Sequence, residues 1–222
     1  MKILILAAMD KEVNLLLNLL KEPKENYIEE IKIWEVEIYS HFVFISKCGI
    51  GKVNSALNTL RLIERIQPDL TINSGVAGGA GLPIGTLLVA DKVAYHDVWC
   101  GPGTYYGQAE GVPLYMTPSK KILEISNSLG LFSGLICSGD KFISTANEIN
   151  EIRSHFPEVK AVDMESASIA QTCILRETPF AVIRVVSDTP GEGENVSQYK
   201  DFWTLAPQKT FEAINKILKE LK

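Results

Sequence analysis

The chain has 222 residues, of which 46% are hydrophobic and 22% charged, and its formal net charge is −5. This composition excludes intrinsic disorder, collagen and coiled coil, and a mildly acidic chain without a basic run is a poor binder of nucleic acid. The length favours a single domain, expected over residues 1–222. The first apolar stretch, residues 3–9, is too short to span a bilayer and lacks the cleavage site of a secretory signal. We therefore expect a soluble cytoplasmic protein that contacts neither nucleic acid nor membrane.

The four cysteines, Cys48, Cys100, Cys137 and Cys173, lie far apart in the sequence. No pair has the spacing of metal ligands, and no histidine stands beside one of them. We expect four reduced thiols packed as small apolar side chains, and no structural zinc site.

The N-terminal part of the chain predicts several buried strands. Residues 2–8 form a continuous apolar run, as in a strand buried on both faces of a sheet. Helical spacing takes over in residues 10–20, after an acidic cap candidate. Residues 27–47 alternate apolar and polar side chains, which predicts two or three antiparallel strands. Residues 69–73 predict another buried strand, which we expect the glycine-rich residues 74–81 to end.

Helical and extended patterns alternate along the rest of the chain. This alternation predicts an α/β fold with a mostly parallel sheet, to which residues 27–47 add antiparallel strands. A loop rich in glycine, proline and tyrosine is expected over residues 99–113. The remaining helices are predicted at residues 49–66, 118–129, 146–155 and 165–176 and from about residue 201, and the remaining strands at residues 85–96, 134–138, 159–163 and 180–187.

Polar groups and glycines follow several of the predicted strands. Ligands of α/β folds bind beyond the carboxyl ends of the parallel strands, so these residues are expected to meet at one edge of the sheet. Several carboxylates, a glycine-rich turn, a methionine and a phenylalanine there predict a small-molecule pocket with acid–base chemistry. The residues are Met9, Glu12, Ser74, Gly75, Gly78, Gly79, Asp140, Phe142, Ile143, Met164, Glu165, Ser187 and Asp188.

Each of these signals also has a purely structural interpretation. Glu12 and Glu165 fall in first turns of helices, where a carboxylate is favoured by the helix dipole. Asp188 precedes Thr-Pro-Gly, which taken alone favours the start of a turn over a functional role. The glycines fit neither a dinucleotide-binding nor a Walker pattern. The pair His96–Asp97 could form a proton relay, although a surface-loop pair is the better interpretation.

Six motifs in chain order resemble those of one family. Together the chain resembles a 5′-methylthioadenosine/S-adenosylhomocysteine nucleosidase of the nucleoside phosphorylase-type superfamily over essentially its whole length. The resemblance implies a three-layer α/β/α fold with a central mixed, mostly parallel sheet flanked by helices. It implies no cofactor or metal, a nucleoside and water as substrates, and typically a homodimer. The motifs are AMDKE (8–12), CGIGK (48–52), NSGVAGG (73–79), SGDKFI (138–143), VDME (162–165) and RVVSD (184–188).

The resemblance also implies roles for the catalytic and sugar-binding residues. Glu12 would activate the attacking water, and Asp188 would protonate purine N7 with Ser187 fixing its side chain. Glu165 would bind the ribose hydroxyls. Two further residues complete the sugar site in this interpretation: Met164, packing against the ribose, and Arg184, supporting the sugar-binding carboxylate.

The remaining implied contacts are to the base and the 5′ substituent. Phe142 would stack on adenine, and the backbone of Ile143 would read its Watson–Crick edge. Met9 and Ile50 would line the 5′-alkylthio pocket, over which Tyr199 closes. The substrate-binding glycine turn comprises Val76, Ala77 and Gly78, with Val76 where many members carry serine, and Asp163 replaces a common glutamate.

The chemistry of N-glycosidic cleavage requires an acid and a base in one pocket, because positive charge develops on the ribose and negative charge on the purine. We expect desolvation to keep Asp188 protonated and the helix N-terminus to keep Glu12 ionised. A phosphorylase needs cations to hold phosphate, and in the first half only Arg61 and Arg65 are available, both within a predicted helix. Water is therefore the favoured nucleophile.

Three alternatives remain open at this stage. A futalosine-type nucleosidase would share the acid, the base and the sugar-binding pair. A purine nucleoside phosphorylase is disfavoured by the shortage of arginine. A non-catalytic nucleoside-binding module would have no use for both Glu12 and Asp188.

Overall fold

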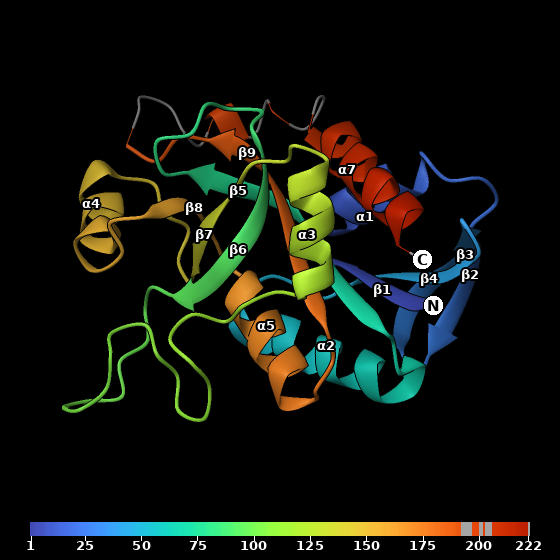
Figure 1. Cartoon of the computed structure of the whole chain (residues 1–222), viewed down its shortest axis with the longest axis horizontal. Helices are drawn as coiled ribbons and strands as arrows, with labels where there is room; N and C mark the ends of the chain where they lie inside the picture. Colours follow the sequence, from blue (N-terminus) through green and yellow to red (C-terminus); the bar gives the residue numbers. More distant parts are fainter. Residues whose placement is uncertain (192–196, 200–201, 203–205, 222) are drawn as a thin grey trace.

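The computed structural model of the chain describes residues 1–191, 197–199, 202 and 206–221. Helices cover both faces of one mixed sheet, which gives the predicted three-layer arrangement (Figure 1). The strands are β1 (Lys2–Ala7), β2 (Lys24–Ile28), β3 (Ile31–Ile38), β4 (His41–Lys47), β5 (Leu70–Gly79), β6 (Leu87–Tyr95), β7 (Ser133–Ser138), β8 (Val159–Asp163) and β9 (Phe180–Asp188). The helices are α1 (Asp10–Leu17), α2 (Lys52–Ile66), α3 (Lys120–Ser128), α4 (Ala146–His155), α5 (Ser166–Leu175) and α7 (Ala206–Glu220).

The sheet has the order β2-β3-β4-β1-β5-β8-β7-β6-β9, and β9 also pairs with β5. Strands β5 to β9 therefore close into a ring. Strands β1 to β4 continue the sheet outward from β5, with β2 at its open edge. Parallel pairs are β1–β4, β1–β5, β5–β9, β6–β7 and β7–β8. The pairs β2–β3, β3–β4, β5–β8 and β6–β9 are antiparallel. The closure brings the ends of β5, β8 and β9 next to one another.

Apolar side chains bury both faces of the sheet. All nine residues of β9 are buried, as expected of a strand covered on both sides. One apolar cluster includes Leu62 of α2 and Ile169 of α5. A second includes Val13 of α1 and Ile217 of α7. Figure 1 shows α2 with α5, and α1 with α7, on the two sides of the strands.

Strand β5 corrects one prediction. Residues 74–81 were expected to end the strand after residue 73, but β5 continues through Gly79 and pairs with β9 from Thr71 to Gly78. Glycine weakens a strand on its own, yet it allows other groups to approach the backbone closely. A Cβ at Gly79 would lie 2.7 Å from the carbonyl oxygen of Leu82 and 2.8 Å from Val186. The glycines thus serve close packing within a continuous strand.

Two further segments bear on the predictions. The long segment between β6 and α3, which includes the predicted loop, extends away from the sheet (Figure 1). The expected start of the last helix, Asp201, lies outside the described residues, and α7 is described from Ala206. Within the described part of the chain, none of the helices combines the length and apolar character needed to cross a lipid bilayer.

Candidate active site

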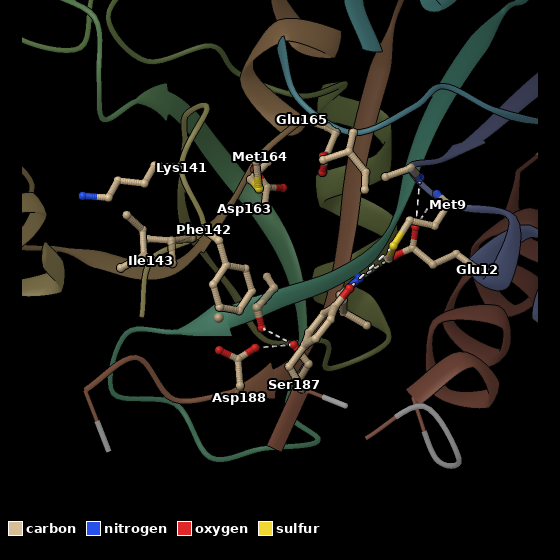
Figure 2. Close-up of a pocket in the computed structure, with 17 residues that line it drawn as sticks. Met9, Glu12, Lys141, Phe142, Ile143, Asp163, Met164, Glu165, Ser187 and Asp188 are labelled. Atoms are coloured by element: carbon tan, nitrogen blue, oxygen red, sulfur yellow. Dashed lines mark hydrogen bonds between the residues drawn. The ribbon is translucent and has the colours of Figure 1, made fainter. Parts of the chain in front are cut away.

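A pocket lies where β1, β5, β8 and β9 end, at the edge of the sheet where the polar groups were predicted to meet. Figure 2 shows Glu12 and Asp188 on opposite sides of it, with Glu165 on a third side. The structure places most of the predicted site residues on its wall. Those lining it are Met9, Glu12, Ile50, Val76, Ala77, Gly78, Phe142, Ile143, Met164, Glu165, Ser187, Asp188 and Tyr199.

Glu12 combines the two interpretations that the sequence left open. Its Oε2 accepts hydrogen bonds from the backbone N–H groups of Ala8 and Met9, at 2.9 and 3.1 Å, which caps α1. Its Oε1 accepts the N–H of Val76 at 3.2 Å and lines the pocket. Burial raises the pKa of Glu12, while the positive charge of Arg184 and these three N–H groups oppose the rise. The net pKa of Glu12 is therefore raised by burial, although the helix N-terminus was expected to keep the carboxylate ionised.

Asp188 is buried at the end of β9, on the far side of the pocket from Glu12. The hydroxyl of Ser187 lies 2.6 Å from its Oδ1 and 3.3 Å from the carbonyl oxygen of Ala77 on β5. The hydroxyl therefore links the carboxyl group to the neighbouring strand. This contact fixes the orientation of the Asp188 side chain.

Glu165 stands between β8 and α5, and only 7% of it is exposed. Its Oε1 accepts the N–H of Gly51 at 3.1 Å, which joins it to the N-terminus of α2. Burial and the nearby charge of Asp163 raise the pKa of Glu165, and Arg184 and the Gly51 amide oppose them. A carboxylate held in this way presents a hydrogen-bond acceptor to the pocket.

Arg184 does not line the pocket, which corrects its predicted place in the substrate-binding set. The side chain is fully buried behind the wall, because it points from β9 toward β5 and β8. Its Nε donates to Asp163 Oδ2 at 2.9 Å, and its Nη2 donates to Asn73 Oδ1. Longer hydrogen bonds, both 3.4 Å, run from Arg184 to the hydroxyl of Ser166 and to the carbonyl oxygen of Ile183. Arg184 acts on Glu12 and Glu165 through its charge.

An aromatic pair covers one end of the pocket. The rings of Phe142 and Tyr199 meet edge to face, with centroids 5.6 Å apart. The Tyr199 hydroxyl donates to the sulfur of Met9 at 3.5 Å. Phe142 is 42% exposed, so its ring is accessible from the pocket mouth, whereas Ile143 is buried. A planar apolar ligand fits beside such a ring.

The glycine-rich end of β5 contributes backbone to the pocket. The N–H of Val76 donates to Glu12, so this contact does not depend on the serine that many family members carry. A Cβ at Gly75 would lie 2.6 Å from Glu12 Oε1. A Cβ at Gly78 would lie 3.0 Å from Pro190 and 3.2 Å from Val162. The strand is therefore held close to both the carboxylate and the segment after β9.

Several residues at the site were not predicted as parts of it. Asp163, Ala8, Val162 and Lys141 line the pocket, and Asn73 binds Arg184 behind it. Their positions at the ends of buried strands were the available signal for Asp163 and Asn73. The pairing of Arg184 with both Asp163 and Asn73 requires β5 to β9 to close into a ring. The local sequence pattern does not reveal this closure.

Charge around the pocket bears on the nucleophile. Arg61 and Arg65 both bind Glu29, on the outer side of α2. Among the described residues that line the pocket, Lys141 is the one cation, and it forms an ion pair with Glu148 at 2.6 Å. Figure 2 shows its side chain pointing away from Glu12 and Asp188.

The chain is similar to known proteins over essentially its whole length. A model of the phosphorylase superfamily matches residues 2–219. A 5′-methylthioadenosine/S-adenosylhomocysteine nucleosidase of Bacillus thuringiensis is 34% identical over the full length of both chains. One of Haemophilus influenzae is 36% identical over 95% of both.

Solved structures of related proteins have the same fold. The S-adenosylhomocysteine nucleosidase of Streptococcus pyogenes, in complex with 5-methylthiotubericidin, superposes with a TM-score of 0.94 at 32% identity, over 100% of this chain and 98% of that one. A futalosine hydrolase mutant of Helicobacter pylori reaches 0.90 at 27% identity, over 99% of both chains. The full-length matches and the shared fold show that the chain belongs to the phosphorylase superfamily, within its family of 5′-methylthioadenosine/S-adenosylhomocysteine nucleosidases.

Proposed function

We propose that this pocket binds a purine nucleoside with a 5′-thio substituent and hydrolyses its N-glycosidic bond, releasing adenine and a 5-alkylthioribose. The substrates are 5′-methylthioadenosine and S-adenosylhomocysteine, for which the Bacillus and Haemophilus relatives are named. One observation carries the proposal: two buried carboxyl groups, Glu12 and Asp188, lie across one pocket in different surroundings. Cleavage of an N-glycosidic bond needs such a pair.

Asp188 is the proposed acid on the purine side. Negative charge develops on the departing base, and a proton delivered to N7 neutralises it. The Ser187 hydroxyl, 2.6 Å from Oδ1, holds the carboxyl group in one orientation. Phe142 stacks on the adenine in this arrangement, and the backbone of Ile143 binds its Watson–Crick edge.

Glu12 is the proposed base on the ribose side. Its raised pKa makes it a stronger base than an exposed glutamate, and three backbone N–H groups fix its position. The carboxylate activates water and stabilises the positive charge that develops on the ribose ring. Glu165 binds the ribose hydroxyls, and Met164 packs against the sugar.

Water is the proposed nucleophile. Phosphate binding needs cations aimed at the dianion. Arg61 and Arg65 are engaged by Glu29, and Glu12 would repel phosphate. The 5′ substituent is proposed to lie among Met9, Ile50 and Tyr199, which are apolar or aromatic and suit a thioether. 

We also propose that the enzyme is a homodimer in the cytoplasm. Val53 and Leu57 on α2 are 76% and 54% exposed, and Ile50 beside them is 49% exposed. Trp99 and Tyr105, in the segment after β6, are also exposed, and Lys52 joins the two segments through Asp97. Exposed apolar side chains on two joined segments are typical of a subunit interface. Cys48, Cys137 and Cys173 are buried free thiols, which fit a reducing compartment. Cys100 is exposed, so the prediction that all four cysteines are packed in the interior is wrong for this residue.

A substrate panel tests the proposed activity. Purified protein is incubated with methylthioadenosine, adenosylhomocysteine, inosine and an aminofutalosine, each with and without phosphate, and the released base is quantified. We expect adenine from the first two compounds at rates independent of phosphate. Strict dependence on phosphate would assign a phosphorylase, and cleavage of the aminofutalosine alone would assign a futalosine-type enzyme. Binding without cleavage would assign a non-catalytic module.

A further inference from the structure

Three charged residues form a bridge beside the pocket, which we term the Asp97 bridge: Lys52, Asp97 and Asp140. One oxygen, Asp97 Oδ2, accepts both the Nζ of Lys52 at 2.9 Å and the backbone N–H of Asp140 at 2.8 Å. Asp140 Oδ1 in turn accepts the backbone N–H of Lys52 at 2.7 Å. Each residue thus binds the other two through charge-assisted hydrogen bonds.

The bridge joins three segments that are distant in sequence. Asp97 follows β6, Asp140 follows β7, and Lys52 is the first residue of α2. Glycines let these segments meet. A Cβ at Gly139 would lie 2.5 Å from the ring of His96 and 2.7 Å from the carboxyl carbon of Asp97, and one at Gly51 would lie 2.9 Å from Asp140 Oδ1.

Two of the joined segments carry the wall of the nucleoside pocket. Phe142 and Ile143 lie two and three residues after Asp140, and both line the pocket. On the other side, Gly51 precedes Lys52, and its N–H binds Glu165 Oε1. The bridge therefore connects the loop proposed to hold adenine with the helix end that orients the proposed ribose-binding carboxylate.

We propose that Asp97 is a positioning residue for nucleoside binding, which acts by locking the Phe142 loop against the N-terminus of α2. This inference rests on the proposed function of the pocket. Asp97 is exposed in the loop after β6, as the surface-loop interpretation of the His96–Asp97 pair predicts, whereas His96 is buried. Among the described residues that line the pocket, none belongs to the bridge, so Asp97 does not touch the reacting atoms. His96 is buried with its backbone N–H bound to the carbonyl of Ser138, and its ring packs on Gly139.

The physical consequence is an effect on affinity. Without Asp97, Lys52 Nζ and the Asp140 N–H lose their common acceptor, and the loop must be ordered when the nucleoside binds. The free energy needed to order the loop weakens the binding of substrate and of transition state by the same amount. The variant therefore has a higher KM and a nearly unchanged kcat. We expect Asp97→Ala to raise KM for methylthioadenosine about tenfold, because it removes the contribution of about one charge-assisted hydrogen bond to binding. The kcat of this variant should stay within about threefold of the wild type.

The experiment compares three variants. Asp97→Ala removes the bridge, and Asp97→Asn keeps an acceptor for Asp140 but loses the charge that holds Lys52. The matched control is Glu29→Gln, which disrupts two ion pairs to the same helix, with Arg61 and Arg65, away from the pocket. Steady-state kinetics and hydrogen exchange of residues 139–143 and 51–52 are measured for each purified protein.

The proposal predicts raised KM and faster exchange in residues 139–143 for Asp97→Ala, a smaller change for Asp97→Asn, and wild-type behaviour for Glu29→Gln. It is overturned if KM and exchange stay within twofold of the wild type, or if kcat falls while KM does not change. Absence of adenine release by the wild-type protein would refute the proposed function instead. The exchange data still decide whether Asp97 holds the loop in that case.

Discussion

Glu12 shows how one side chain can serve both a helix and a pocket. Its carboxylate caps α1 through the N–H groups of Ala8 and Met9 and reaches Val76 on β5 at the same time. A first-turn glutamate is so common that the sequence could not separate capping from catalysis. Burial supports the proposed catalytic role, because Glu12 is 7% exposed, whereas a capping carboxylate at the surface remains solvated.

The raised pKa of Glu12 gives a pH prediction. The proposed base must be ionised, so kcat/KM should fall as the pH decreases through the pKa of Glu12, at a pH above the ordinary value of 4.5. Since burial also raises the pKa of Glu165, the decrease of kcat/KM at low pH reflects protonation of both carboxylates. The measurement is kcat/KM for methylthioadenosine from pH 4 to 9. Constant kcat/KM down to pH 4.5 would contradict this assignment.

Glu165 offers a test that separates stability from activity. Its folded pKa lies above the ordinary 4.5, so the protonated form contributes stability below that pH, and this contribution is lost as the pH rises through the folded pKa. Glu165→Gln keeps an oxygen for the Gly51 N–H and removes the charge beside Asp163. We expect this variant to have a free energy of unfolding about 1 kcal/mol higher at pH 8, which raises Tm by roughly 3 °C. Its affinity for the nucleoside should fall.

Thermal melts at pH 8 and pH 4.5 check this expectation. The advantage of Glu165→Gln should shrink toward pH 4.5, because the wild-type carboxyl group is then protonated. A Tm of the variant below that of the wild type at pH 8 would show that the carboxylate stabilises the fold instead.

At the scale of elements, the glycines of β5 determine how closely Glu12 approaches the strand. A Cβ at Gly75 would lie 2.6 Å from Glu12 Oε1 and 3.4 Å from Arg184 Nη1. Gly75→Ala should therefore displace the carboxylate and lower kcat about a hundredfold, the loss expected when a reacting group moves by roughly 1 Å.

A double-mutant cycle identifies the route of this effect. If Gly75→Ala acts through Glu12, adding it to Glu12→Gln should cause no further loss of turnover. Two independent, multiplicative losses would mean that the alanine disrupts the pocket elsewhere. Circular dichroism confirms in each case that the variant is folded.

Most helices and strands were predictable because their signals are local. The capping box of α4, with Thr145 and Glu148, and the apolar runs of β1 and β9 fix those elements within a residue or two. Strand β5 was not predicted in full, because its glycines resemble a turn when read alone. Its continuation depends on pairing with β9, which is a long-range contact.

At the scale of the whole molecule, closure of β5 to β9 into a ring assembles the site. The residues proposed for catalysis were found from strand ends and from the family motifs. The network around Arg184 was not: Asp163 and Asn73 reach it only because β8 and β5 flank the same arginine. The Asp97 bridge has the same origin, since the loops after β6 and β7 meet the N-terminus of α2 only in the folded chain.

The proposed homodimer gives a prediction at this scale. Val53 is 76% exposed on α2, and a charge there should oppose burial in an interface. Val53→Glu should shift the protein from dimer to monomer in analytical ultracentrifugation. Phe42→Glu, on a β4 residue that is 61% exposed, is the control and should leave the dimer intact. A wild-type protein that sediments as a monomer would contradict the proposal.

We propose that two buried carboxyl groups on opposite sides of one pocket cleave the nucleoside. The most direct test is the turnover of methylthioadenosine by Asp188→Asn, with Glu12→Gln measured beside it and folding checked by thermal melts. We expect each substitution to lower kcat by about two to four powers of ten while the fold is retained. Near-normal turnover by a folded Asp188→Asn protein would contradict it.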